Sequence, residues 1–511
     1  MMETDMSTSA RETPASAQGG AAVEQCAIAA AFVAFFVAWA AYFAISDLGA
    51  SIHHDMAEAY AWGREFQLGY SKHPPFWAWV CGAWFAAAPR AGWSFAILVS
   101  LNATLGLLGS WRLIGRFANG DKRIAATVLL LLTPFYTFLS YRYNANTILL
   151  SVWPWTLFAF VRAIDGGRLR DAVLFGAFVA IAVLSKYYAA ILAATCLLAA
   201  LQHPARARYF SSASPYVSAA VTAALCAPHL WWVIANGAPT VNYFIAETGR
   251  NLPVVAGHAA DALVGVLEQN AVVVAVVAFV GRSTLPRSLA TMRTWLAEPR
   301  LRVLATLAIA PLVLTVAAAF VFRNQISTNM MVGVFSLAPL LAIEIVGPAE
   351  LARLRKISFG LAGTLTIGAL AASPIVALGT AWLSNGPRDV EPRKELAAAA
   401  TDLWLDKTGK PLAFVGGSSR YDTAVAFYSK ERPHAFIGLD FHGNPSVSPS
   451  ELANDGLLSV CLKDDAQCRE ATRALATPQA SEVELILAHH FWGHVAKPAT
   501  FVITVIPPIS R

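Results

Sequence analysis

The sequence predicts an α-helical polytopic membrane protein that carries a small α/β domain at its C-terminal end. Of the 511 residues, 56% are hydrophobic and only 14% are charged, whereas soluble proteins carry roughly 25% charged residues. Long apolar segments follow one another as far as residue 384, whereas residues 385–511 have ordinary polarity. We therefore divide the chain into a tail (1–24), a transmembrane domain (25–384) and a C-terminal domain (385–511).

The tail is predicted to be disordered, because its first residues are mainly Ser, Thr, Ala and Gly. No secretory signal peptide precedes the first apolar segment, which is too long for the hydrophobic part of such a signal. We therefore expect the tail to stay in the cytoplasm and the first apolar segment to remain as a membrane span.

The transmembrane domain contains about 11 candidate spans, each close to the ~20 apolar residues that a helix needs to cross the hydrocarbon core. They are 25–46, 93–117, 124–141, 147–164, 172–186, 187–202, 215–235, 261–281, 301–322, 329–347 and 358–384. Segment 76–89 is apolar but short and is bounded by prolines, so we expect an interfacial helix in the first outer loop.

Lysine and arginine are concentrated in alternate loops, and this bias predicts an N-terminus inside and a C-terminus outside. The loops assigned to the cytoplasm hold cations at 112–123, 162–170, 206–208, 282–302 and 353–356. We attribute the net charge of +6 to this bias, because no basic stripe with interleaved aromatic residues indicates nucleic-acid binding. The outer face has these exceptions: Arg64, Lys72, Arg90, Arg142, Lys186, Arg250 and Arg323.

The C-terminal domain is predicted to mix short strands with helices. Strands are expected at 412–416, 457–462, 483–488 and 500–505, and helices at 393–407, 420–430 and 464–475. Cys461 and Cys468 lie in this domain and would be able to form a disulfide in an oxidising compartment, although the sequence leaves their pairing open. His489, His490 and His494 are interpreted as part of a terminal strand and turn rather than as metal ligands.

The first outer loop, residues 51–80, concentrates polar side chains between two membrane spans. Such a loop is costly to retain there unless it has a function. Asp55 and Glu58 are three residues apart, so a helix would place both on one face. Asp55 is the candidate general base for an acceptor hydroxyl. Glu58 is a second candidate, with the alternative that it only favours the helix N-terminus electrostatically.

Lys72 and His73 precede Pro74 and Pro75, which restrict the direction of both side chains. Lys72 is a candidate ligand of a leaving phosphate, or else a lysine whose stem lies along the membrane interface. His53 and His54 precede Asp55 and raise the question of a divalent cation. We predict no metal site there, because adjacent residues point apart in regular structure.

Three further outer junctions each carry a cation. Arg142 lies with Asn146 in one, Lys186 with Tyr187 in the next, and Arg323 in a third. One interpretation of each is an interface cap; in a bundle, the three would converge on an anionic headgroup. We therefore predict a lipid-phosphate site formed by these residues together with Lys72 and His73.

Several of these pieces resemble the first periplasmic loop of glycosyltransferase families 39 and 83, the bacterial relatives of protein O-mannosyltransferases and of the lipid A aminoarabinose transferase. The resemblance rests on Asp55, Glu58-Ala59-Tyr60, Gly69-Tyr70 and His73-Pro74-Pro75. Thr133-Pro134, Leu184 to Tyr187, and Val505 to Pro508 also agree with the families. The chain also resembles the rhizobial subgroup that decorates lipopolysaccharide core or lipid A with uronic acid or hexose.

The resemblance implies a GT-C fold, a polyprenyl-phosphate sugar donor and a catalytic aspartate at Asp55. It also implies a bacterial inner-membrane enzyme that glycosylates lipid A, lipopolysaccharide core or another envelope glycan, with no cofactor other than a possible divalent cation. This chain departs from the pattern twice, with Lys72 before His-Pro-Pro and Asn146 where many members have a second aspartate. Both departures leave Asp55 as the one well-placed base.

Two other functions remain open from the sequence. A lipid or sugar transporter without transferase activity would often show internal repeats and charges at mid-membrane. Here the charges cluster at outer junctions and no repeat is visible, which favours the enzyme. A non-catalytic assembly or sensor protein would depend on residues 385–511 and not on Asp55.

Overall fold

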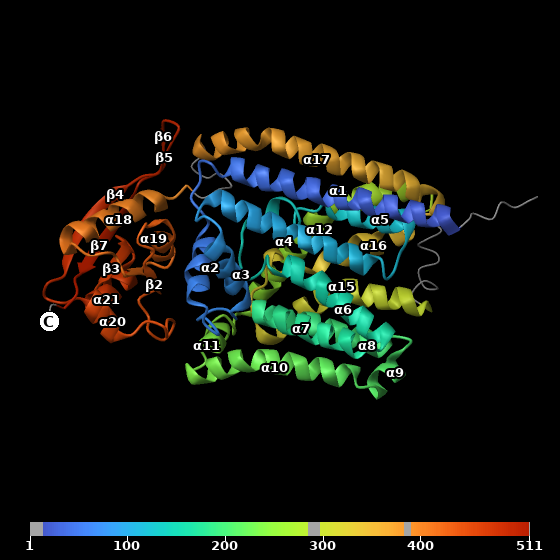
Figure 1. Cartoon of the computed structure of the whole chain (residues 1–511), viewed down its shortest axis with the longest axis horizontal. Helices are drawn as coiled ribbons and strands as arrows, with labels where there is room; N and C mark the ends of the chain where they lie inside the picture. Colours follow the sequence, from blue (N-terminus) through green and yellow to red (C-terminus); the bar gives the residue numbers. More distant parts are fainter. Residues whose placement is uncertain (1–13, 285–296, 383–389, 510–511) are drawn as a thin grey trace, which may run out of the picture.

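The computed structural model describes residues 14–284, 297–382 and 390–509. Long helices run side by side in a bundle, and a separate α/β domain lies at one end of it (Figure 1). Within these described ranges, six helices are long and apolar enough to cross a membrane. They are α1 (Pro14–Ser46), α4 (Gly92–Ile114), α10 (Ser214–Ala235), α12 (Leu252–Gly281), α15 (Pro299–Phe322) and α17 (Pro348–Trp382). The chain is thus a multi-pass membrane protein.

Shorter helices complete the bundle and correspond to most of the remaining predicted spans. They are α5 (Gly120–Leu130), α6 (Leu149–Gly166), α7 (Leu169–Ser185), α8 (Ala190–Gln202) and α16 (Ala338–Ala342), with the short connecting helices α9 (Arg206–Ser211) and α11 (Pro239–Ala246). Helix α1 begins at Pro14, so residues 14–24 of the tail predicted to be disordered are helical. The first thirteen residues lie outside the described part of the chain.

Two predicted spans are not continuous helices. Segment 124–141 leaves the α-helix after Leu130, and turns and the 3-10 helix η1 (Phe138–Tyr141) follow. Pro134 lies at this break, where it lacks the N–H that a continuing helix requires. Segment 329–347 consists of α16 and the 3-10 helices η3 (Thr328–Met331), η4 (Val334–Leu337) and η5 (Ile343–Ile345). Hydrophobicity alone predicted the positions of these segments but not their breaks.

Small residues allow the central helices to approach closely. A Cβ added at Gly106 of α4 would lie 2.4 Å from the carbonyl oxygen of Leu150 in α6. The Asn102 side chain of α4 donates to the Thr147 carbonyl at 2.7 Å and accepts from Ser151 Oγ at 2.6 Å. Small residues and interhelical hydrogen bonds of this kind hold helices together in lipid, where apolar contacts give little preference.

The first outer loop forms two short helices across the end of the bundle, α2 (His54–Glu65) and α3 (Phe76–Ala87). Helix α3 confirms a short apolar helix in the segment predicted to be interfacial. The two helices touch backbone to backbone, since a Cβ on Gly63 would lie 2.4 Å from the Ala78 carbonyl oxygen. Both lie between the bundle and the C-terminal domain (Figure 1).

The C-terminal domain is built on a five-stranded mixed sheet with the order β2-β1-β3-β7-β4. Strands β1, β2 and β3 are parallel, and β7 pairs antiparallel with β3 and β4. The strands are β1 (Phe414–Gly417), β2 (His434–Ile437), β3 (Leu457–Leu462), β4 (Ser481–Leu487) and β7 (Ala499–Ile506), with the hairpin β5 (His490–Phe491) and β6 (His494–Val495). The helices are α18 (Arg393–Thr408), α19 (Asp422–Tyr428), α20 (Pro449–Asp455) and α21 (Ala466–Leu475).

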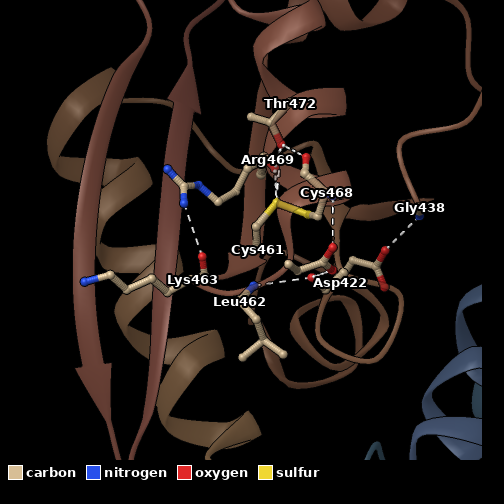
Figure 2. Close-up of a disulfide and its surroundings, with 11 residues drawn as sticks. Asp422, Gly438, Cys461, Leu462, Lys463, Cys468, Arg469 and Thr472 are labelled. Atoms are coloured by element: carbon tan, nitrogen blue, oxygen red, sulfur yellow. Dashed lines mark hydrogen bonds between the residues drawn. A yellow bond between two sulfur atoms is a disulfide. The ribbon is translucent and has the colours of Figure 1, made fainter.

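The four predicted strands and three predicted helices of this domain are confirmed, whereas β2 and α20 were not predicted. The histidine-rich segment forms the hairpin expected of a terminal strand and turn. Cys461 and Cys468 form a disulfide that joins β3 to α21 (Figure 2). The structure therefore decides the pairing that the sequence left open.

The C-terminal domain packs directly on the first outer loop. Ser51 Oγ donates to the carbonyl of Glu391 at 2.8 Å, and the Tyr428 hydroxyl accepts from the backbone N–H of Ile52 at 2.8 Å. Further bonds across this interface join Arg64 to Pro433, Ser446 to Glu65, Arg90 to Phe427 and Ser429, and His489 to Gly49. The loop that carries Asp55 is thus held from both sides.

Candidate active site

Asp55 lies in the first turn of α2 because His53 caps this helix. His53 has extended backbone angles, and its Nδ1 accepts from the backbone N–H of Asp55 at 3.2 Å. An acid in the first turn is also favoured by the positive end of the helix dipole. The cap fixes the Asp55 carboxylate at the surface where α2 meets the bundle.

Two side chains hold this carboxylate. Asn144 Nδ2 donates to Asp55 Oδ2 at 2.9 Å, and His54 Nε2 lies 3.1 Å from Oδ1. Burial acts to raise the pKa of Asp55, but the bonds from His54 and Asn144 outweigh it and keep the pKa well below its usual range. Asp55 is therefore ionised and is suited to accept a hydrogen bond from a hydroxyl.

His53 carries no charge at neutral pH. Burial lowers the pKa of His53 to about 3, and the nearby Arg142 and Arg393 add to the effect although Asp55 opposes it. His53 is therefore neutral at pH 7. The two histidine rings lie 4.0 Å apart. Our expectation that they would point apart is wrong, because His53 lies outside the helix that begins at His54.

His53, His54 and Asp55 offer two imidazole nitrogens and a carboxylate oxygen within 4.8 Å of one another. Zinc and similar divalent ions bind such a set of donors. His54 Nε2 already contacts Asp55 Oδ1, and His53 Nδ1 already accepts from the backbone N–H of Asp55. These are the residues that would hold a cation if the reaction uses one.

Glu58 and Lys72 form an ion pair beside Asp55. Lys72 Nζ donates to Glu58 Oε1 at 2.7 Å, and Glu58 is buried whereas Lys72 is half-buried. Burial raises the pKa of Glu58 although Lys72 opposes it. Lys72 stands where many members of families 39 and 83 have an acid. Its positive charge is therefore paired with the carboxylate of Glu58.

A turn between two spans connects Asp55 to a second cation. Asn144 Oδ1 accepts from the backbone N–H groups of Asn146 and Thr147, and Lys186 Nζ donates to Asn146 Oδ1. The Asn144 side chain therefore bonds to Asp55 and also sets the position of Asn146, which holds Lys186. Sequence reasoning singled out Asn146 and Lys186 but gave Asn144 no role.

His73 lies close to this turn and carries no charge. Burial lowers the pKa of His73 to about 3, and the positive charges of Lys186 and Lys72 add to the effect. Its ring contacts those of Trp77 and Tyr243 edge-on. A neutral imidazole here supplies a hydrogen bond or a surface for stacking rather than a positive charge.

Tyr187 takes part in a chain of hydrogen bonds beside the site. Its hydroxyl lies 2.7 Å from His229 Nε2 and 3.0 Å from Thr240 Oγ1, and His229 Nδ1 lies 2.7 Å from the carbonyl of Leu68. This chain of bonds ties α10 to the first outer loop. His229 is itself buried.

The remaining two predicted cations lie apart from Lys186. Arg142 faces His53, stacks on Tyr141 and lines a cavity against the C-terminal domain. Arg323 is exposed at the C-terminal end of α15, where its carbonyl accepts from the backbone of Arg250. Within the described residues, no hydrogen bond or ion pair joins the Arg323 side chain to Asp55, Lys72 or Lys186.

Comparison with known proteins supports the resemblance to GT-C glycosyltransferases of families 39 and 83. The model of the dolichyl-phosphate-mannose-protein mannosyltransferase family matches residues 72–232. The fold matches the crystal structure of ArnT from Cupriavidus metallidurans bound to undecaprenyl phosphate at 14% identity and a TM-score of 0.59, over 93% of this chain and 98% of that chain. The apo form of ArnT matches equally, over 94% and 98%. A search of curated proteins gave no match. The membrane domain and the α/β domain thus together form a GT-C fold of the ArnT type.

Proposed function

We propose that this protein, whose fold is that of membrane glycosyltransferases, transfers a sugar from a polyprenyl phosphate to a hydroxyl group of an envelope lipid or glycan. The ionised Asp55, fixed by Asn144 and His54 next to Lys186, carries this proposal. The similar ArnT structure holds undecaprenyl phosphate, which supports a polyprenyl phosphate as the donor. Lipid A or lipopolysaccharide core is the acceptor that we propose.

The reaction is an inverting substitution at the anomeric carbon. The acceptor oxygen forms a bond to this carbon while the bond to the phosphate oxygen breaks, and the polyprenyl phosphate leaves with the electron pair. Asp55 accepts the hydrogen bond of the attacking hydroxyl, and the proton passes to the carboxylate or to the departing phosphate. Because the pKa of Asp55 is low, its main role is to orient the hydroxyl and to stabilise developing positive charge.

The proposed orientation places the site in the periplasm of a bacterial inner membrane. The lysine and arginine bias puts the N-terminus in the cytoplasm, and the Cys461–Cys468 disulfide is typical of an oxidising compartment. A donor in the outer leaflet would reach Asp55 from the bundle side, where Lys186 lies.

Replacement of Asp55 tests the proposal. Asp55→Asn retains shape and loses the negative charge, so we expect transfer to fall by about 100- to 10,000-fold with unchanged thermal unfolding. The measurement is transfer from undecaprenyl-phosphate sugars in membranes, together with lipid profiles of a deletion strain complemented with each variant. Asp402→Asn, on an exposed face of α18, is the matched control. Near wild-type turnover of Asp55→Asn would overturn the assignment of Asp55, whereas no transfer by the wild type would favour a transporter or a non-catalytic role.

A further inference from the structure

A cavity of about 490 Å³ lies between the first outer loop and the C-terminal domain. Its walls come from four parts of the chain: the end of α1 with the start of α2, the start of α4, the end of η1 with Arg142, and the C-terminal domain. The lining includes His53, His54, Trp93, Arg142, Lys394 and Arg420. Since the C-terminal domain supplies one wall, the cavity exists only when that domain is docked.

The lining is positively charged. Its cations are Arg142, Arg393, Lys394 and Arg420, and its acids are Asp47 and Glu391. Arg393 is fully buried and bonds to Glu391 at 2.8 Å and to the carbonyl of Ile52, so it serves the interface. The other cations present their charge to the cavity from both walls.

Arg420 and Lys394 are placed for binding rather than for structure. Arg420 follows β1 in the turn that leads to α19, and its side chain is exposed. Turns at the carboxyl ends of parallel strands are where α/β sheets bind ligands. Lys394 lies over the Tyr428 ring at 5.8 Å and donates to the carbonyl of Ala50 at 3.1 Å, which leaves two of its three protons for a ligand.

The cavity reaches the two histidines that precede Asp55, although Asp55 itself does not line it. His53 and His54 line it, and both also contact Asp55. Lys186 and Lys72 are not among the lining residues. The cations of the cavity are therefore a different set from Lys186 and Lys72.

The rim of the cavity is apolar where it meets the membrane end of the bundle. Leu48 is 57% exposed and Trp93, at the start of α4, is 49% exposed. A large aromatic side chain at this position is typical of the boundary between lipid and water. A molecule with an acyl part and an anionic head matches this combination of an apolar rim and a cationic wall.

We infer that this cavity is the acceptor site, and that Arg420 and Lys394 of the C-terminal domain, with Arg142, bind a phosphate or carboxylate group of the acceptor. The inference rests on the proposed transfer reaction and adds the class of acceptor. The donor phosphate then binds on the Lys186 side of Asp55, and the anionic group of the acceptor binds on the Arg420 side. Charge-assisted bonds from arginine and lysine to such groups are strong and directional.

Binding measurements on the full chain test this without knowledge of the natural acceptor. The protein is placed in nanodiscs of phosphatidylcholine, and protection against thermal unfolding is titrated with glucose 1-phosphate, glucuronic acid and glucose. We expect protection by both anions and none by glucose. Arg420→Gln and Lys394→Gln should each weaken protection by about tenfold, whereas Arg473→Gln, on the exposed face of α21, should not.

A second arm separates a free anion from a lipid-borne one. Nanodiscs that contain phosphatidic acid should compete with glucose 1-phosphate if the anionic group reaches the cavity from the membrane, and should not if the cavity takes only soluble groups. Both results support an anion site provided that Arg420→Gln weakens the binding. Equal protection by glucose and glucose 1-phosphate, or no effect of Arg420→Gln and Lys394→Gln, would overturn the inference.

Transfer assays distinguish failure of this inference from failure of the proposed function. Arg420→Gln should raise the acceptor KM by about tenfold and leave the donor KM unchanged. If Asp55→Asn abolishes transfer while Arg420→Gln leaves both constants unchanged, the enzyme stands and the acceptor site is wrong. If the donor KM rises instead, the cavity binds the donor and the inference is overturned.

Discussion

Two cationic regions flank Asp55, and they differ in how their charges are compensated. Lys72 of the first outer loop is paired with Glu58, and on the bundle side Lys186 is held by Asn146. On the side of the C-terminal domain, Arg420 projects from a turn and is exposed. A held cation is preorganised for one ligand geometry, whereas an exposed cation adapts to several. We therefore expect the bundle side to be the more demanding in its choice of ligand.

The largest effect should come from replacing Lys186, which we expect to raise the KM for the donor. Lys186→Ala removes the cation that Asn146 orients, so we expect the donor KM to rise about 10- to 100-fold and the acceptor KM to stay unchanged. Steady-state kinetics with each substrate varied in turn measure this. Lys186→Arg, which keeps the charge, should recover part of the loss. An unchanged donor KM in Lys186→Ala would remove this residue from the site.

A smaller effect, on stability, should come from the ion pair between Glu58 and Lys72. Glu58→Ala leaves Lys72 half-buried without its partner, so we expect a loss of about 1–3 kcal/mol of stability. Lys72→Ala should cost less, because a carboxyl group whose pKa is raised by burial can protonate. Thermal unfolding of both single variants and the double variant gives the coupling energy. Additive effects in this cycle would show that the pair contributes nothing to the region.

The bundle side was largely predictable from sequence and the other side was not. Asp55, Lys186 and Asn146 follow from charges at span ends, where any polar residue is conspicuous against apolar neighbours. Arg420 lies in a domain of ordinary polarity, where one exposed arginine carries no signal. Its place opposite Arg142 depends on how the C-terminal domain docks, a contact between residues far apart in the chain.

The same reasoning explains the partial success for the fold. The lengths of the apolar segments predicted where the spans lie. The breaks after Leu130 and around α16 depend on local hydrogen bonding, which hydropathy does not report. Asn144 was missed because its role depends on two partners, Asp55 and the backbone of Asn146, which only the folded turn brings together.

The smallest effect concerns the docking that creates the cavity, and it should appear as a dependence on pH. Glu65 of α2 accepts from Ser446 of the C-terminal domain at 2.9 Å, and burial raises its pKa to about 7 although this bond opposes the shift. The folded protein therefore retains a proton that the unfolded chain releases above its ordinary pKa of 4.5. This contribution to stability is complete below pH 4.5 and is lost as the pH rises through about 7.

We accordingly expect the unfolding temperature of the full chain to fall by a few degrees between pH 5 and pH 8, the shift that about 1 kcal/mol produces. Glu65→Gln cannot ionise and should flatten this part of the profile, whereas Glu431→Gln, at an exposed position, should not. If weaker docking opens the cavity, protection by glucose 1-phosphate should fall over the same pH range in the wild type and less in Glu65→Gln. A profile identical in wild type and Glu65→Gln would show that docking, and with it the cationic wall of the cavity, is independent of this carboxyl group.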